Sequence, residues 1–490
     1  MQHLTFDFNN MFSFNVSASH GVTEKQLQMA SPQISRAHKH LKRVIADPAD
    51  RVGLQLEWTR LPFQDRTTVG RIQRLGNEIA NKYKNVIFLG IGGSYLGLKA
   101  AQDALCPPYY NEFSSLRGKR PRIYFEGNNV DPTPLRALLR NLNPKRTYVI
   151  VISKSGETTE TKVALEVVSE WLKKGVGRTY GRQVFAITAP WTGTLRKKVN
   201  EAQQNDKLSF RSSTFLPGVG GRYSELNTGL LHLAIAGVNI QEVLDGARAM
   251  AERCSSASLR RNPAYMYAAL QTMLYRRKGK SIAVLMPFSE ALKSTADWYA
   301  QLLAESLGKK YGRVVAVSAD GREIWKADKS RAVNVGRTPV PCRGTKDLHS
   351  IQQNNVEGEN DKTVTFIRVE KFKEDVRIPK GKDFLSGKRY SQLIKLAQEA
   401  TEWALVRQKR PNCTIIMPEI TPFHWGELIF FFEMATAFEG ELLNVNAFDQ
   451  PGVQGYKDYM YSKLGKPDMS RRVEREIERH PLKKRVRFIL

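Results

Sequence analysis

Short apolar runs separated by longer amphipathic segments dominate the chain from residue 85 onward. In the first half, these runs cover residues 86–89, 122–125, 148–152 and 184–188. Apolar runs of this length are typical of strands buried on both faces of a parallel sheet, and the segments between them are long enough for crossover helices. The pattern therefore predicts a βαβ unit in this part of the chain.

A second series of apolar runs follows a helical pattern over residues 225–254, and the two series together predict an α/β fold with two units in tandem. The strands of the second unit are expected at 282–286, 314–318, 364–369 and 414–417, with polar loops around 352–361 and 371–387. The expected domains are an N-terminal arm or cover at 1–70, a first sheet unit at 71–255, a second at 256–465, and a basic C-terminal helix and tail at 466–490.

The C-terminal segment is rich in charged residues. Residues 471–479 have the pattern of a helix that ends near Pro481, and basic residues follow at 483–487. Arg472 and Glu476 are four residues apart, a spacing at which opposite charges pair on a solvated helix. A solvated helix is therefore favoured over an arm that binds nucleic acid.

Composition limits the classes of protein that this chain can form. With 490 residues, of which 41% are hydrophobic, the chain is long enough for two or three units with their own cores. No apolar run is long enough to cross a bilayer, and the N-terminus lacks a basic region followed by an apolar one, so a cytoplasmic protein without membrane contact is expected. The formal net charge of +28 favours anionic ligands, but it does not distinguish a sugar phosphate from a nucleic acid.

The four cysteines are scattered along the chain, at positions 106, 254, 342 and 413. They form no Cys-x-x-Cys pair and have no cluster of histidines near them in the sequence. This spacing argues against a zinc site and against a disulfide framework, so no metal is expected and the thiols are interpreted as reduced.

Residues 151–161 place hydroxyl groups, a lysine and a glycine where an apolar strand gives way to a helix. The backbone N–H groups and the positive end of the helix dipole attract a phosphate dianion at such a point. Ser153, Ser155 and Thr158 supply hydroxyl donors and Lys154 supplies a full positive charge. The alternative is that the hydroxyl groups only cap the helix.

A glycine-rich turn, residues 90–97, follows the first predicted strand and allows close approach of the backbone to a ligand. A dinucleotide-binding fingerprint would need a third glycine where Tyr95 stands, and no clear acidic residue follows at the required distance. A nicotinamide or flavin site is therefore disfavoured. Ser94 is left as a candidate contact to a sugar or a phosphate.

Two further segments carry candidate chemistry. Gly220 and Gly221 precede Arg222, whose guanidinium group would face an anion at the mouth of a turn. The helical pattern over 291–307 puts Gln301 and Glu305 on one face, and Gly308 ends the helix. On that last turn, the negative end of the helix dipole makes the Glu305 carboxylate a better proton acceptor, although an exposed surface glutamate is the alternative.

His349 lies in a polar loop of the second unit, where most histidines have no chemical role. Gln450 and Lys457 are seven residues apart, so they share one helical face if a helix begins at Pro451. This spacing would place an amide and an ammonium group on the same side.

In their order and spacing, these segments resemble the glucose-6-phosphate isomerase, or phosphoglucose isomerase, family. The matching segments are residues 90–94, 152–156, 220–224, 301–306 and 448–453. The resemblance runs from about Trp58 to about Lys466 and is nearest to the shorter bacterial members, because of residues 347–350 and the proline after Gln450. It implies two sugar-isomerase (SIS) domains, each a parallel sheet between two layers of helices. The chain is more basic than is usual for the family, and the tail beyond Lys466 is expected to have no counterpart.

The resemblance also implies the reaction. It implies an aldose–ketose isomerase of glycolysis and gluconeogenesis that interconverts glucose 6-phosphate and fructose 6-phosphate through a cis-enediol, without a cofactor. Glu305 would carry a proton between C2 and C1, and Arg222 would stabilise the enediolate. The implied contacts to the phosphate or the sugar are Ser153, Lys154, Ser155, Thr158, Gln301 and Gln450.

His349 and Lys457 would open the hexose ring, and Glu160 is the candidate that orients the histidine. In this family the histidine comes from the neighbouring subunit, so the resemblance implies an obligate homodimer with two shared active sites.

Three alternatives stay open from the sequence. One is an isomerase that also acts on mannose 6-phosphate. Another is a non-catalytic SIS-domain regulator that senses a phosphosugar and binds nucleic acid, although no helix-turn-helix or zinc-finger pattern precedes the sheet units. The third is an active enzyme that also binds polyanions through its basic surface.

Overall fold

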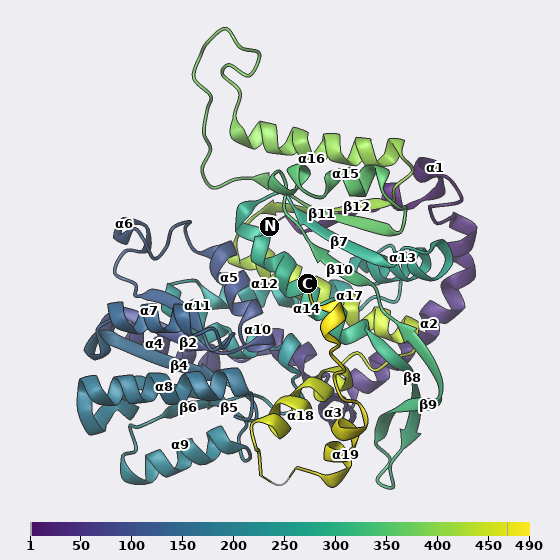
Figure 1. Ribbon diagram of the computed structural model, residues 1–490. Coiled ribbons are helices and arrows are strands. Elements are labelled where there is room, and N and C mark those ends of the chain that lie inside the picture. Colours follow the sequence, from purple (N-terminus) through teal and green to yellow (C-terminus); the bar gives the residue numbers. More distant parts are fainter. Residues whose placement is uncertain (1, 468) are drawn as a thin grey trace. The chain divides into compact units, whose positions relative to one another are not determined.

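The computed structural model describes residues 2–467 and 469–490. Within it, Met1–Ala447 and Phe448–Leu490 are two separate compact units. The first unit contains the two larger sheets and nearly all of the helices (Figure 1). Mixed α/β structure with parallel sheets between helices confirms the predicted fold class.

The first sheet is entirely parallel and has the strand order β3-β2-β4-β5-β6. Its strands are β2 (Asn85–Leu89), β3 (Arg122–Glu126), β4 (Thr147–Ile152), β5 (Val184–Thr188) and β6 (Arg211–Thr214).

Side chains of the first sheet alternate between its two faces. Ile87 and Leu89 join a core with α7 (Pro132–Asn141), α8 (Thr159–Val176) and α9 (Thr194–Asn205). Phe88 points the other way and meets His232 of α11 (Leu230–Ala236), with ring centroids 5.1 Å apart. The four predicted strands of this unit are present, and β6 is an edge strand that the pattern missed.

The second sheet has the order β1-β12-β11-β7-β10. Its strands are β1 (Thr5–Asp7), β7 (Ile282–Pro287), β10 (Thr338–Pro341), β11 (Lys362–Lys371) and β12 (Asn412–Glu419). All pair in parallel except β1, which runs antiparallel to β12 at one edge. The opposite edge is β10, which contains two prolines. Proline lacks the N–H group that a central strand needs, which explains both why β10 lies at an edge and why the sequence did not indicate it.

The predicted strand at 314–318 is wrong as a member of this sheet. Those residues end β8 (Lys309–Val317), which pairs antiparallel with β9 (Glu323–Val335) in a separate two-stranded ribbon. Val314, Val315 and Val317 are all exposed. A run of valines favours a strand, but this preference does not specify the partner strand or the extent of burial.

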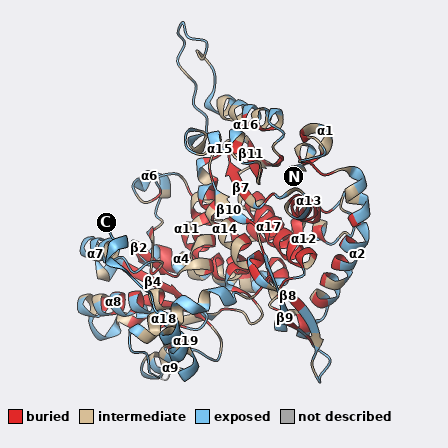
Figure 2. Ribbon diagram, turned by 45° about the vertical axis from the view of Figure 1, so that its right-hand side comes forward, coloured by how far each residue is buried: buried red, intermediate tan, exposed pale blue. Residues whose placement is uncertain are grey.

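Helix α17 (Pro422–Leu443) is buried along nearly its whole length and lies at the centre of the first unit (Figure 2). It packs against α12 (Ile240–Cys254), α13 (Pro263–Lys278) and α14 (Lys293–Leu307). Two glycines permit the closest of these contacts, because a Cβ atom at Gly246 or Gly426 would overlap the backbone of the other helix. A helix buried on all sides needs partners for its polar side chains, and two of its glutamates, Glu439 and Glu441, pair with Arg337 and Arg313.

The N-terminal segment contributes more than a cover. Helix α2 (Glu24–Ala46) starts at a capping box formed by Thr23 and Gln26 and packs against α17 and α13, and β1 extends the second sheet. The domain boundaries at 70, 255 and 465 stay predictions. The remaining α-helices of the first unit are α1 (Ser13–Val16), α3 (Pro48–Gly53), α4 (Arg66–Lys82), α5 (Leu96–Leu105), α6 (Ser114–Arg117), α10 (Glu225–Thr228), α15 (Gln352–Glu357) and α16 (Tyr390–Arg407).

The second unit contains two α-helices, α18 (Gln454–Lys463) and α19 (Arg471–Arg479), among its described residues. The bounds of α19 are those that the charge pattern predicted, and Ser470 caps its N-terminus. Among residues 2–467 and 469–490, no helix combines the length and apolar character that crossing a membrane would need.

Candidate active site

The predicted phosphate-binding segment forms the loop between β4 and the N-terminus of α8. The buried Ser153 Oγ accepts a hydrogen bond from the Gly156 N–H (3.0 Å), and Ser155 Oγ accepts one from the Glu157 N–H (3.1 Å). Both hydroxyl groups keep their own protons for donation to a ligand. Thr158 is the N-cap residue of α8, but its side chain makes no capping bond. The loop therefore directs hydroxyl and helix N-terminal N–H groups toward one region, the arrangement that binds an anion.

Lys154 links this loop to the segment before Arg222. Its Nζ atom donates to the Val219 carbonyl oxygen (3.0 Å) and lies 5.7 Å from the centroid of the Phe215 ring. Desolvation lowers the pKa of Lys154, although the residue as a whole keeps exposed surface. An ammonium group that has lost part of its hydration is attracted more strongly to a phosphate than a fully solvated ammonium group is, because less water screens the two charges.

Gly156 has φ +77°, and a Cβ atom there would overlap the backbone of Leu195. We expect Gly156→Ala to displace the phosphate loop and to raise KM for a phosphorylated substrate by about tenfold or more. Gly177→Ala is the matched control. Gly177 has φ +73°, and a Cβ atom added there would have no other atom within 4 Å. Both variants should lose about 1–2 kcal/mol of stability from the left-handed backbone. Equal KM values in the two variants would contradict the assignment of the loop.

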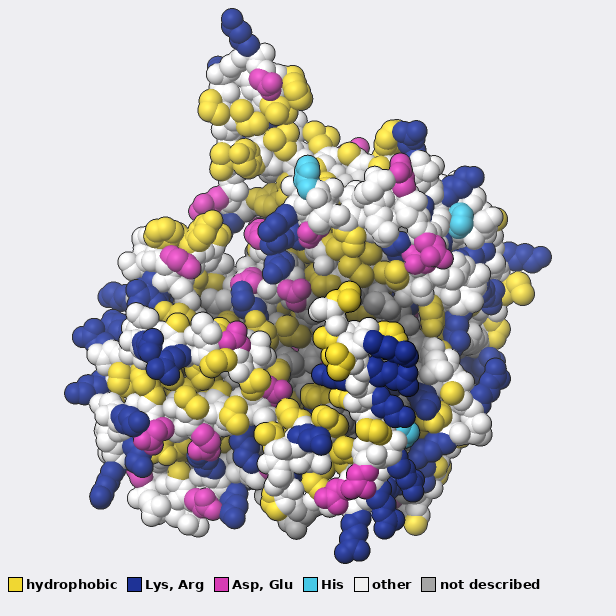
Figure 3. Space-filling model, viewed as in Figure 1, with side chains coloured by type: hydrophobic (Ala, Val, Ile, Leu, Met, Phe, Trp, Pro, Cys, Tyr) yellow, Lys and Arg dark blue, Asp and Glu magenta, His cyan; other side chains and the backbone are white. Residues whose placement is uncertain are grey.

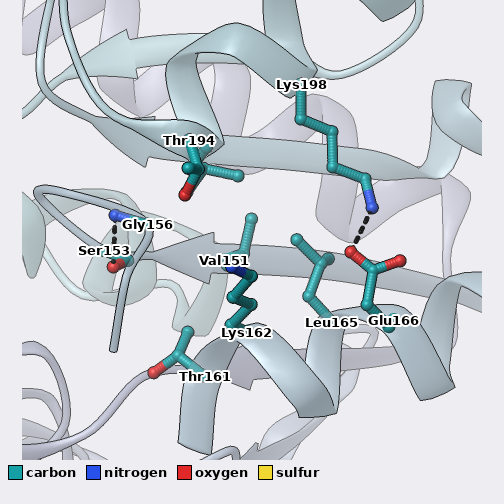
Figure 4. A pocket seen from close by; sticks show the side chains of 10 residues that line it. Val151, Ser153, Gly156, Thr161, Lys162, Leu165, Glu166, Thr194 and Lys198 are labelled. Carbon is teal, nitrogen blue, oxygen red and sulfur yellow. Dashed lines mark hydrogen bonds and ion pairs between the residues drawn. The ribbon is translucent and has the colours of Figure 1, made fainter. Parts of the chain in front are cut away.

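A pocket beside the loop does not coincide with the candidate catalytic groups. Ser153 and Gly156 border it, and the rest of its lining comes from β4, α8 and α9, including Thr161, Leu165 and Thr194 (Figure 4). Neither Glu305 nor Arg222 contributes to it.

Glu305 lies on the last turn of α14, as predicted. Its Oε1 atom accepts from Gln301 Nε2 (3.2 Å), and its Oε2 atom is 3.2 Å from NH1 of Arg222. The Glu305 side chain is 31% exposed, whereas that of Arg222 is only 4% exposed. The carboxylate is thus held on one side by an amide and a guanidinium group and is accessible on the other.

Arg222 is fixed by more than its contact with Glu305. Its Nε atom donates to Ser306 Oγ (2.9 Å), and its NH2 atom donates to the Ala447 carbonyl oxygen (2.7 Å). Tyr223 Oη also lies 3.1 Å from Ser306 Oγ. The sequence did not reveal these partners, because they lie more than 80 residues away along the chain.

The glycine-rich turn meets the same groups. A Cβ atom at Gly92 would lie 2.8 Å from Gln301 Nε2, and one at Gly93 would overlap the Gly221 backbone. Ser94 lies in the same turn, which is a 3₁₀ helix over Gly92–Ser94. The absence of side chains here lets the turn, α14 and the Arg222 segment approach one another.

A buried carboxyl pair lies behind the Arg222 segment and was missed by the sequence analysis. Glu225 Oε1 accepts from the Trp298 indole N–H (2.7 Å), and both Glu225 and Glu433 are buried, with 2% of each residue exposed. Burial raises the pKa of both groups. For Glu433, the nearby Glu225 carboxyl group raises the pKa further.

Two of the other predicted residues, His349 and Glu160, make no hydrogen bond or ion pair with Glu305 in the part of the chain that the structure describes. His349 ends the 3₁₀ helix Lys346–His349 and is exposed, while Glu160 lies in the first turn of α8. Within the described part of the chain, no hydrogen bond or ion pair connects these two side chains. Gln450 and Lys457 belong to the second unit. There a 3₁₀ turn over Pro451–Val453 leads directly into α18 from Gln454, so a helical segment begins at Pro451, and the shared face of Gln450 and Lys457 stays a prediction.

One short segment of backbone separates an anion-binding helix N-terminus from a carboxylate–guanidinium pair, an arrangement that suits an acid–base enzyme acting on a phosphorylated substrate. A family model described as phosphoglucose isomerase matches residues 66–477. The chain belongs to the phosphoglucose isomerase family, which confirms the resemblance and the predicted class of enzyme.

Similar proteins agree over nearly the whole length. The glucose-6-phosphate isomerase of Carboxydothermus hydrogenoformans is 39% identical and aligns with 99% of each chain, and that of Symbiobacterium thermophilum is 36% identical over 94% of this chain and 98% of its own. A crystal structure of a hypothetical protein from Thermus thermophilus has a TM-score of 0.78 at 32% identity and covers 94% of this chain and 99% of that one. The glucose-6-phosphate isomerase structure from Chlamydia trachomatis has a TM-score of 0.73 at 20% identity, covers 98% and 91% of the two chains, and shows the shared fold.

The expected end of the resemblance near Lys466 is wrong. The family model continues to residue 477, through most of α19. The charge-rich composition of this helix hid the similarity, because solvated positions tolerate many different residues.

Proposed function

We propose that this chain is an aldose–ketose isomerase that interconverts glucose 6-phosphate and fructose 6-phosphate, with Glu305 as the base and with the loop at Ser153–Thr158 as the phosphate site. The observation that carries the proposal is a chain of contacts. Lys154 of the loop donates to the Val219 carbonyl, and Arg222, three residues further on, contacts Glu305. The anion site and the carboxylate thus flank one short segment of backbone.

The reaction follows from the chemistry of these groups. Glu305 removes the proton from C2 of the open-chain aldose, and the electron pair forms a C1=C2 double bond while O1 gains negative charge. The fixed Arg222 guanidinium stabilises that charge. After a proton moves from O2 to O1, Glu305 returns its proton to C1 and leaves the ketose carbonyl at C2. Gln301 orients the carboxylate between the two carbons.

The remaining sequence assignments are part of the proposal. His349 and Lys457 open the ring, Glu160 orients the histidine, and Ser94 and Gln450 contact the substrate. The reaction needs no cofactor. As a glycolytic enzyme the protein acts in the cytoplasm, and the first sheet unit supplies the phosphate site while the second supplies the base.

We further propose that the enzyme is a homodimer in which His349 acts in the partner's site. The exposed position of His349 supports this. So does an exposed apolar surface on α16 and on the segment that projects before it, residues 372–389, where hydrophobic side chains are visible in Figure 3. Phe384 is 82% exposed and Trp403 is 61% exposed. A second copy of the chain is the occupant that would cover these side chains.

Mixing two inactive variants tests the shared site. Glu305→Gln and His349→Gln homodimers should each be inactive. After denaturation and refolding together in equal amounts, about a quarter of the sites should contain both native residues, because random pairing makes half of the dimers mixed and one site in each is intact. Activity near that fraction of the wild-type value is expected. The control is each variant refolded alone, and a mixture that stays inactive would contradict the shared site.

The function itself is tested by adding fructose 6-phosphate to wild-type protein in the presence of a metal chelator and following the appearance of glucose 6-phosphate. Conversion at a rate typical of metabolic enzymes, about 10 s⁻¹ or more, is expected. Mannose 6-phosphate in a parallel assay distinguishes an enzyme of dual specificity. A protein that binds fructose 6-phosphate without converting it would instead be the regulator, which family membership does not favour.

A further inference from the structure

The carbonyl group that fixes Arg222 belongs to a short loop at the end of α17. Asn444 ends this helix in the left-handed conformation, with φ +55°, and the chain then turns back so that the Ala447 carbonyl meets the Arg222 guanidinium (2.7 Å). The position of the loop over residues 444–447 therefore sets the position of the guanidinium group.

The β8–β9 ribbon holds this loop by paired hydrogen bonds. The Arg313 N–H donates to the Asn444 carbonyl (2.7 Å), and Asn444 Nδ2 donates to the Arg313 carbonyl (3.1 Å). The Arg313 side chain turns back to α17, where its two terminal nitrogens bind both oxygens of Glu441, at 2.7 and 2.9 Å. Its guanidinium carbon lies 4.0 Å from the centroid of the Trp325 ring. One arginine thus ties the ribbon to the helix end and to the loop beyond it.

Glu441 is shared with a histidine of α2. His40 Nδ1 lies 2.7 Å from Glu441 Oε2, and His40 Nε2 lies 2.7 Å from Glu323 Oε1 of β9. Both carboxyl groups are nearly fully buried, with side chains 5% and 4% exposed. Figure 1 shows the ribbon beside α2 and α3, the elements that supply the other charged groups.

The charges of this cluster balance only when His40 is protonated. Arg43 pairs with Glu323 and lies 3.6 Å from Asp50, whose Oδ1 atom accepts the Glu323 N–H. With a neutral His40, the two positive charges of Arg43 and Arg313 would face three negative charges, those of Asp50, Glu323 and Glu441. The hydrogen bond to Glu441 raises the pKa of His40 against the opposing effect of burial. For Glu441, burial acts to raise the pKa, but the bonds from His40 and Arg313 outweigh it and leave the pKa below its ordinary value.

We propose that Arg313 and Asn444, held by Glu441 and the imidazolium of His40, are positioning residues that set the orientation of Arg222 toward the enediolate. This inference rests on the proposed function, since it assigns the residues a role in that reaction. None of these four residues, all of which the structure describes, makes a hydrogen bond or ion pair with Arg222 or Glu305. Their effect reaches Arg222 through the Ala447 carbonyl group.

Asn444→Gly is the sharpest variant, because glycine adopts φ +55° without strain and only the bond from Nδ2 to Arg313 is lost. We expect kcat to fall by roughly tenfold, since small displacements of a catalytic group are costly, and KM for fructose 6-phosphate to stay within about twofold. A sugar-acid phosphate whose carboxylate mimics the enediolate should bind about tenfold more weakly, because it reports the contact with Arg222. Arg313→Lys should show the same pattern more strongly, since lysine cannot bind both oxygens of Glu441.

Arg337→Lys is the matched control. Arg337 forms a second buried two-point ion pair with the same helix, through Glu439 at 3.1 and 2.8 Å, but no bond joins it to the 444–447 loop. It should lose thermal stability like Arg313→Lys while keeping kcat and the affinity for the carboxylate analogue. If kcat of Arg337→Lys fell as much as that of Arg313→Lys, general destabilisation would explain both results, and the inference would be overturned.

The charge balance predicts the effect of pH. A raised pKa means that the stabilisation by His40 is complete below its unfolded value, near 6.5, and is lost as the pH rises through the higher folded value. His40→Gln should therefore lower the melting temperature most at about pH 6 and least at about pH 9. A melting temperature difference that does not change with pH would contradict the protonated state.

The outcomes separate this inference from the proposed function. Wild-type protein without isomerase activity would reject the function. Active wild-type protein with unchanged kcat and unchanged analogue affinity in Asn444→Gly would reject only the positioning role.

Discussion

Glu305→Gln should abolish turnover, with a fall in kcat of about 10⁴-fold, while the protein still binds fructose 6-phosphate. Positioned acid–base groups contribute up to about this factor, and an amide cannot accept the proton from C2. Binding should persist, because the phosphate loop at Ser153–Thr158 contributes none of its contacts through Glu305. Kinetics with fructose 6-phosphate and calorimetric titration with the same compound measure the two effects.

The chain offers a close control for this substitution. Glu357 also lies on the last turn of a helix, α15, and also accepts a hydrogen bond from a glutamine four residues earlier, Gln353 (2.6 Å), but it is exposed on the surface. Glu357→Gln should leave kcat and KM unchanged. If Glu305→Gln retained more than a small fraction of wild-type activity, the assignment of the base would be wrong.

Arg222→Lys should lower kcat by about 10²–10³-fold with little change in KM. Lysine keeps the charge, but it lacks the planar fork that reaches Glu305, Ser306 and the Ala447 carbonyl together, so the charge is no longer fixed where the enediolate forms. A loss of one fixed donor to an oxyanion usually has an effect of about this size. Steady-state kinetics and a thermal melt should be recorded on the same preparation.

Arg120→Lys controls for loss of an arginine that holds backbone carbonyl groups. Arg120 NH1 donates to Asn77 Oδ1 (2.9 Å) and to the Ala234 carbonyl (3.3 Å), in the first unit and away from Glu305. This variant should melt at a lower temperature with unchanged kcat. Equal kinetic losses in both variants would mean that Arg222 acts through stability and not through charge.

The sequence predicted those parts of the fold that local patterns determine. The buried strands of the first sheet and the helix that ends after Glu305 came from apolar periodicity and from a glycine stop. Edge strands were missed, because β6 and β10 are only four residues long and β10 carries two prolines. The valines of β8 indicated a strand but not its partner, since pairing depends on the tertiary structure.

The candidate site shows the same division. Hydroxyl groups before a helix and a glutamate at a helix end were evident from spacing alone. The contacts that orient Arg222 were not, because Ser306 and Ala447 lie 84 and 225 residues from it in the sequence. The network of Arg313, Glu441 and His40 could not be predicted for the same reason. Charged residues that are far apart in the sequence give no periodic pattern from which a contact could be inferred.

The most direct test of proton transfer through an enediol intermediate is to convert fructose 6-phosphate in heavy water with wild-type protein in the presence of a metal chelator. The product is then examined by NMR. Proton transfer through Glu305 predicts that part of the glucose 6-phosphate carries deuterium at C2, because the Glu305 carboxyl group exchanges its proton with solvent between the two transfers. The Glu305 side chain is 31% exposed, so product without any deuterium at C2 would contradict proton transfer by this solvent-accessible carboxyl group.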